Sequence, residues 1–98
     1  MNRITLSPVM DRNAIDGHLA ELKTAFAGGG TIEIGCGQIE QIGLMGLQLL
    51  ASAIRTGQQR ETAVSLIDVN APMAAAITLA GMQSILLNGL SADAGAVA

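Results

Sequence analysis

The sequence predicts an α/β fold with one hydrophobic core and a mostly parallel sheet. Segments with strand patterns alternate with helical segments, and the helical segments are long enough to carry the chain back across a sheet, as parallel strands require. Half of the 98 residues are hydrophobic, which suffices for one core at this length. We therefore expect a single domain over residues 1–98, with four strands, three helices and a core over about residues 3–87.

The first strand and the first helix occupy the first 30 residues. Residues 4–6 alternate in polarity and precede Pro8, which is typical of a short strand at the start of a fold. A helical pattern follows Asp11, whose carboxylate is a suitable N-cap. The glycines at 28–30 end this helix, since glycine adopts the left-handed conformation common at helix C-termini. The apolar line of the helix consists of Ile15, Leu19, Leu22 and Phe26.

The middle of the chain predicts two further strands around a second helix. Residues 31–36 (TIEIGC) alternate in polarity and are rich in strand-forming residues, so we assign a strand. Residues 44–56 carry a helical pattern, which we expect Gly57 to end. Residues 62–69 (TAVSLIDV) are the strongest strand signal, and their nearly continuous apolar run indicates a central strand that is covered on both faces.

The last part of the chain predicts a third helix and a tail. Asn70 is a suitable N-cap for a helix that begins at residues 71–72, because proline is tolerated in a first helical turn. Gly81 ends this helix, and residues 84–87 are assigned to a last short strand or a turn of helix. The segment 91–98 (SADAGAVA) can bury little surface, so we expect a flexible tail.

Composition argues against several classes of function. The net charge is −3 and the five cationic residues are scattered, which argues against nucleic-acid binding. The longest weakly polar stretch, residues 42–54, is shorter than the roughly 20 residues of a membrane-spanning helix, so we expect no insertion into a membrane. A single cysteine and the lack of a leader pattern favour a cytoplasmic protein. The positive mean hydropathy favours association with a partner.

The residues needed for catalysis are scarce, so we expect no enzyme activity, no metal and no cofactor. The single histidine, His18, and the single cysteine, Cys36, are interpreted as structural side chains. Glu33 and Glu40 are interpreted as solvated charges. Residues 35–40 lack the third glycine of a dinucleotide-binding fingerprint, so a phosphate-binding loop is not expected there.

Residues 38–50 (QIEQIGLMGLQLL) follow a predicted strand and open a predicted helix. This segment resembles the signature of STAS domains (sulfate transporter and anti-sigma-factor antagonist), in which a strand ends in an Asp-Ser/Thr-Ser/Ala-Gly-Leu turn before an apolar helix. The resemblance extends over about residues 3–87, although the start is shorter than in many members. It implies a small STAS-like fold and a binding function. The residues that match the frame are Ile42, Gly46, Leu47, Gln48, Leu49 and Leu50.

The same segment departs from the STAS signature at the site of phosphorylation. Gly43 stands where the family has Asp, and Leu44 stands at the position of the phosphorylatable Ser or Thr. In STAS proteins that antagonise anti-sigma kinases, phosphate at this turn breaks a complex by adding negative charge to a packed surface. The resemblance therefore implies a module whose usual switch is missing at Leu44.

The helical pattern of residues 44–56 separates two faces. The face expected to meet the sheet contains Leu47, Leu50, Ala51 and Ile54. Met45 and Leu49 lie on the opposite face, where they are either a partner surface, or covered by another element, or scattered surface side chains. Gly43 and Gly46 would let a partner backbone approach closely. The candidate partner-binding residues are Gly43, Leu44, Met45, Gly46, Gln48, Leu49 and Ser52.

Three functions compete. The leading one is a constitutive STAS-type regulatory module that binds a signalling kinase or an anti-sigma factor, and the short start with Gly43 after Ile42 resembles small STAS proteins of bacterial chemotaxis. The second is a STAS subunit docked on the ATPase of a lipid-trafficking ABC transporter. The third is a small-ligand or nucleotide-binding domain with a pocket near Cys36, Gly37 and Asp68. Self-association of the chain is left open.

Overall fold

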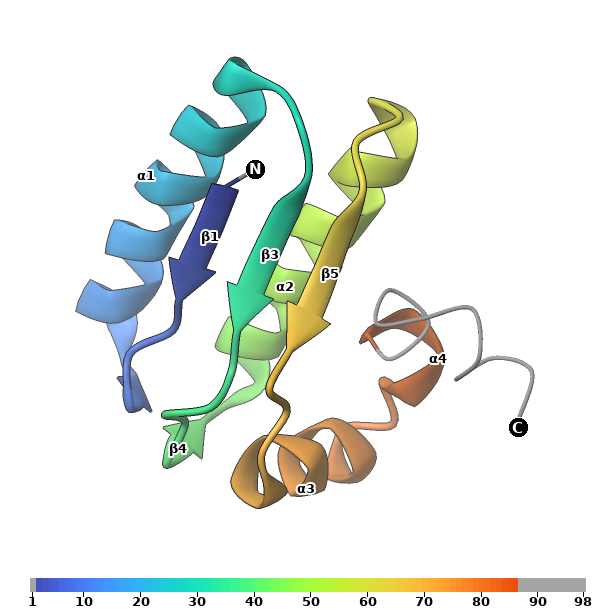
Figure 1. The fold of residues 1–98 in the computed structure, drawn as a ribbon. Helices are drawn as coiled ribbons and strands as arrows, with labels where there is room; N and C mark the ends of the chain where they lie inside the picture. The colour runs from blue at the N-terminus through green and yellow to red at the C-terminus, as the bar shows by residue number, and fades with distance from the viewer. Residues whose placement is uncertain (1, 87–98) are drawn as a thin grey trace.

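The main sheet has three parallel strands and two helices packed on one of its faces (Figure 1). A computed structural model describes residues 2–86 of the chain. The strands β1 (Asn2–Thr5), β3 (Ile32–Gly35) and β5 (Val64–Ile67) lie in the order β1-β3-β5. Helices α1 (Arg12–Gly28) and α2 (Leu44–Gln59) connect them, as parallel strands require. The predicted α/β class with a parallel sheet is confirmed.

A third strand pairing lies outside the main sheet. Strands β2 (Val9–Met10) and β4 (Gln41–Ile42) form a separate parallel pair with two residues in each strand. Both follow a sheet strand, and the carbonyl of Pro8 accepts hydrogen bonds from the backbone N–H groups of Glu40 and Gln41, at 2.7 and 3.0 Å. Among the described residues the expected four-stranded sheet has three strands, because the segment expected as its fourth strand, residues 84–87, is helical where it is described; β2 and β4 form a separate pair.

The centre of the sheet is β3 rather than the last strand. β3 pairs with both β1 and β5, whereas residues 62–69 were expected to be central. On the face toward the helices, Ile4, Ile34 and Leu66 stand side by side and are buried. Ser65 and Ile67 point to the other face and are only half-buried. The apolar run of residues 62–69 predicted a central strand covered on both faces. In the described chain, the order of the strands instead places β5 at one edge of the sheet.

Helix α1 begins where the sequence indicates, but the expected apolar line is only partly buried. The Asp11 carboxylate accepts a hydrogen bond from the backbone N–H of Ala14 at 2.9 Å, which confirms the N-cap. The buried residues are His18, Leu22 and Ala25; Ile15 and Phe26 are half-buried, and Leu19 is 39 % exposed. The position of the sheet decides which face of α1 is buried. That face shares Leu22 with the expected apolar line but also contains His18 and Ala25.

Helix α2 is longer than predicted. The sheet face is confirmed, since its four expected members are buried: Leu47, Leu50, Ala51 and Ile54. Gly57 was expected to end the helix, but α2 continues to Gln59, and Gly57 lies inside it. An added Cβ at Gly57 would lie 2.5 Å from Cγ2 of Val64 and 2.7 Å from the carbonyl oxygen of Thr62. The glycine therefore permits close packing of α2 on the start of β5.

Two helices close the described chain. Helix α3 (Ala71–Leu79) begins after Asn70, whose side-chain oxygen accepts a hydrogen bond from the N–H of Met73 at 3.0 Å, as expected of an N-cap. Helix α4 (Gln83–Leu86) shows a helical turn in place of the alternative strand, so residues 2–86 contain four helices where three were expected. Leu86 is fully buried. The expected tail, residues 91–98, lies outside the described residues.

Candidate partner-binding surface

The start of α2 exposes two large apolar side chains. Gly43 is the N-cap residue, with φ −100° and ψ −174° and no side-chain capping bond. Leu44 and Met45, the first two helical residues, are 56 % and 63 % exposed. Leu44, which stands where the resemblance implies a phosphoacceptor, is thus an exposed apolar side chain at a helix N-terminus.

Gly46 does not belong to this exposed surface. It is buried, and an added Cβ would lie 2.9 Å from Cγ1 of Ile42 and 3.6 Å from Cβ of Met10. The side chains of β4 and β2 already fill the space that the missing Cβ leaves. Gly46 therefore serves internal packing, and the expectation that a partner backbone approaches it is corrected. An added Cβ at Gly43, by contrast, meets nothing within 4 Å.

Val9 adds a residue that the sequence analysis did not identify. It is 45 % exposed and, with Gln41 and Gly43, lines a hollow of about 400 Å³ at the start of α2. An apolar residue directly after Pro8, in a segment with no predicted element, is the only signal for it in the sequence. We call Val9, Gly43, Leu44 and Met45 the α2-end surface, after the N-terminal end of α2 at which they lie.

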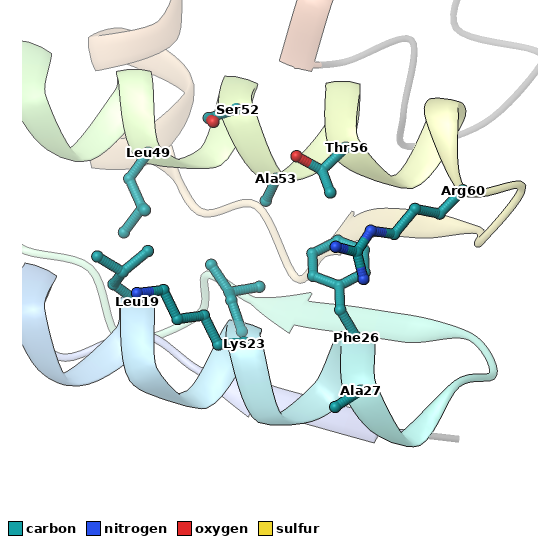
Figure 2. Close-up of a pocket in the computed structure, with 10 residues that line it drawn as sticks. Leu19, Lys23, Phe26, Ala27, Leu49, Ser52, Ala53, Thr56 and Arg60 are labelled. Carbon is teal, nitrogen blue, oxygen red and sulfur yellow. The ribbon is translucent and has the colours of Figure 1, made fainter.

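The other predicted partner-binding residues lie along α2, away from its start. Leu49 and Ser52 line a groove between α1 and α2 with a volume of about 420 Å³ (Figure 2). Gln48 is exposed on α2, in the helical turn between the α2-end surface and this groove. The predicted surface therefore divides into two parts, and we call the second the α1–α2 groove. The lining residues that the sequence analysis did not propose for a partner are Leu19, Leu22, Lys23, Phe26, Ala27, Ala53, Thr56 and Arg60.

His18 has a structural environment. The backbone N–H of Ser7 donates a hydrogen bond to Nε2 of His18 at 3.1 Å, and Nδ1 lies 2.5 Å from Oε1 of Glu21. The ring is 6 % exposed and joins α1 to the loop after β1. Both ring nitrogens are occupied by these contacts, so the structural interpretation of His18 accounts for the residue.

Residues at the proposed ligand pocket, at the ends of β3 and β5, make contacts within the chain. Cys36 is fully buried, and burial, with a smaller effect of the Asp68 charge, raises the pKa of its thiol to about 11. Asp68 accepts a hydrogen bond from the guanidinium of Arg3 at 3.0 Å. The side-chain NH₂ of Asn70 donates to the carbonyl oxygens of Gly37 and Ile39. The polar groups that a small ligand would use are thus engaged within the chain.

The remaining acidic candidates and the usual ligand sets give no site. Glu33 lies on the sheet face away from the helices and is half-buried, and Glu40 is exposed. Within residues 2–86, no three or more His, Cys, Asp or Glu residues gather in a way that could hold a metal ion. Over the same residues, no helix combines the length and the apolar character needed to cross a membrane.

Crossover helices on a parallel sheet, with an apolar helix start after the second sheet strand, define a small α/β domain of the STAS class. The family model described as "Mlab, STAS domain" matches residues 2–88. The chain therefore belongs to the STAS domain family, and the resemblance found in residues 38–50 is confirmed. Comparison with curated proteins and with solved structures gave no match. STAS domains commonly mediate protein interactions.

Proposed function

We propose that this STAS domain is a non-catalytic regulatory module that binds a protein partner in the cytoplasm through its α2-end surface. The observation that carries the proposal is the exposure of Leu44 and Met45 at the turn where the STAS signature has its phosphorylated residue. Fully burying a side chain of this size contributes about 1.5–3 kcal/mol, so a partner that covers both gains a substantial part of its binding free energy there.

The side chains at this surface fit a protein partner better than a small ligand. Met45 is unbranched and adapts to irregular surfaces. Gly43 adds no side chain beside it, so a partner can approach the helix start closely. At the competing ligand pocket, Cys36 is buried and Asp68 pairs with Arg3, which favours the protein-binding proposal.

The binding is constitutive in this proposal, because Leu44 carries no hydroxyl group. Phosphate at this turn would add about −1.5 to −2 charge to a packed surface. Leucine cannot accept it, so the complex is regulated by the amount of each partner or by a modification elsewhere. The partner is a signalling kinase or an anti-sigma factor, with chemotaxis as the narrower assignment. A transporter ATPase is the alternative, in which the same surface acts as a fixed subunit contact.

Affinity purification of the full chain from its native cell, followed by mass spectrometry, identifies the partner. Binding of that partner is then measured with Leu44→Asp/Met45→Asp, which places two charges on the α2-end surface. We expect a loss of at least about tenfold in affinity, since apolar burial is replaced by burial of charge. Leu79→Asp is the matched control, because Leu79 is 92 % exposed on α3.

The outcomes separate the candidates. Recovery of a kinase or an anti-sigma factor supports the leading assignment, and recovery of an ATPase supports the transporter assignment. Unchanged affinity of the folded double variant for the recovered partner rejects the α2-end surface. Circular dichroism and thermal unfolding of each variant show whether the fold is retained.

A further inference from the structure

The α1–α2 groove is a long apolar depression that the two helices leave between them. Both helices run in the same direction along its sides (Figure 2). Leu19 and Leu49 point toward each other at one end, and Phe26 and Arg60 lie at the other. Leu19 is 39 % exposed, and Phe26 and Leu49 are half-buried, so apolar surface at the groove stays in contact with water.

The charged residues of the groove are both positive. Lys23 comes from α1 and Arg60 from the C-cap of α2, and the groove lining contains no acidic residue. Within residues 2–86, neither cation forms a salt bridge within 4.0 Å, and the Arg60 guanidinium instead lies 5.6 Å from the centre of the Phe26 ring. The whole chain has a net charge of −3, so this local positive charge is opposite in sign to the rest. Charge complementarity favours an acidic occupant.

The dimensions of the groove suit a short helix. The seven helical steps from Leu19 to Phe26 span about 10 Å of α1, and the eleven steps from Leu49 to Arg60 span about 16 Å of α2, which is two to three helical turns. Ser52 and Ala53, which line the middle on the α2 side, have small side chains and permit close approach of another helix. Two parallel helices already supply the ridges between which a third helix packs.

We propose that the α1–α2 groove binds an amphipathic helix of the protein partner, whose apolar face carries acidic residues at its edge. The apolar side chains enter between Leu19 and Leu49, and a carboxylate meets Lys23 and Arg60. This inference rests on the proposed function, since it assigns the chemistry of the partner. The groove is a second contact with the partner besides the α2-end surface, and Gln48 lies between the two.

Selection from a library of random peptides of about 16 residues, long enough for four helical turns, tests the chemistry of the occupant. The full chain is the bait. We expect enriched peptides with apolar residues at i, i+3 or i+4, and i+7, and with acidic residues beside them. Enriched peptides without this pattern or without acidic residues contradict the proposal, and so does a selection that enriches no binder.

Charge variants test the location. Lys23→Glu/Arg60→Glu reverses both cations, and we expect the selected peptides to lose at least about tenfold in affinity. Lys23→Gln/Arg60→Gln removes the charge with smaller changes in shape and is the second variant if the first does not fold. Arg55→Glu is the matched control, because Arg55 is exposed on α2 but lines a different hollow. Equal affinity for the wild type and the folded groove variants overturns the assignment.

Binding of the native partner separates this inference from the proposed function. Loss of affinity with the groove variant supports the groove, whether or not the α2-end variant also binds more weakly. Loss with Leu44→Asp/Met45→Asp alone overturns the groove and leaves the proposed function standing. Retained affinity with both variants rejects both assignments.

Discussion

Gly57 and Val64 approach each other so closely that an added Cβ on Gly57 would lie 2.5 Å from Cγ2 of Val64. The contact joins the last turn of α2 to the first residue of β5, and the carbonyl oxygen of Thr62 limits the same space at 2.7 Å. The Val64 side chain could shift to make room for a Cβ on Gly57, but the Thr62 backbone cannot. The contact therefore fixes the distance between helix and sheet.

We expect Gly57→Ala to destabilise the protein by about 1–3 kcal/mol, because overpacking exceeds the gain in helix propensity. Gly17→Ala is the matched control, since Gly17 lies in α1 and an added Cβ meets nothing within 4 Å. It should stabilise by about 0.5–1 kcal/mol. Urea unfolding measures both. Equal effects of the two substitutions would show that the Gly57 contact is not restrictive.

Gly43→Asp should stabilise the domain by about 0.3–1 kcal/mol. The backbone of Gly43 is extended, the site is open, and α2 has no side-chain cap and no acidic residue in its first turn. A carboxylate at the N-cap accepts a backbone N–H and interacts favourably with the helix dipole. Gly43→Ala adds a side chain without an acceptor and should not stabilise. Thermal unfolding at low and high salt distinguishes the two variants.

The Cys36 thiol should be unreactive at neutral pH and should couple stability to alkaline pH. Its pKa is raised from 9.0 to about 11, so the folded state favours the protonated thiol. This contribution to stability is fully present below about pH 9 and is lost as the pH rises to about 11, with a total of about 3 kcal/mol. Alkylation rates measure the reactivity, and urea unfolding from pH 8 to 11 measures the coupling.

Cys36→Ala is the control for that pH dependence. The variant removes the titrating group, so its stability should fall less between pH 9 and 11 than that of the wild type. The alanine also leaves a small cavity. The cavity lowers stability by the same amount at every pH, so it contributes nothing to the dependence of stability on pH. Identical slopes in the two proteins would assign the alkaline loss of stability to other groups.

The ring of His18 should carry its proton on Nδ1 and a lone pair on Nε2. The Ser7 N–H donates to Nε2, so Nε2 must carry a lone pair, and Nδ1 then donates to Glu21. Nitrogen NMR shifts of the ring at neutral pH distinguish this tautomer from the other. His18→Leu should cost about 1–3 kcal/mol, because it leaves the Ser7 N–H without its partner. Observation of the Nε2-protonated tautomer would contradict the arrangement.

The sequence predicted the local features because neighbouring residues cause them. Asp11 and Asn70 cap helices through their own side chains, and the apolar spacing of residues 44–56 gives the face of α2 that meets the sheet. The STAS signature is a contiguous segment, so the sequence alone indicated the family, which the family model confirms. The correspondence of Leu44 to the phosphorylated residue of the family stays a prediction.

Tertiary structure decided what depends on distant segments. Among the described residues, the order of the strands places residues 62–69 at an edge of the sheet. Gly57 was expected to end α2, but it lies inside the helix and packs against Val64. The groove between α1 and α2 needs Leu19 and Leu49 side by side, although 29 residues lie between them. Helical spacing gives the direction of each side chain on its own helix, but only the packing of both helices on one sheet determines which exposed side chains meet.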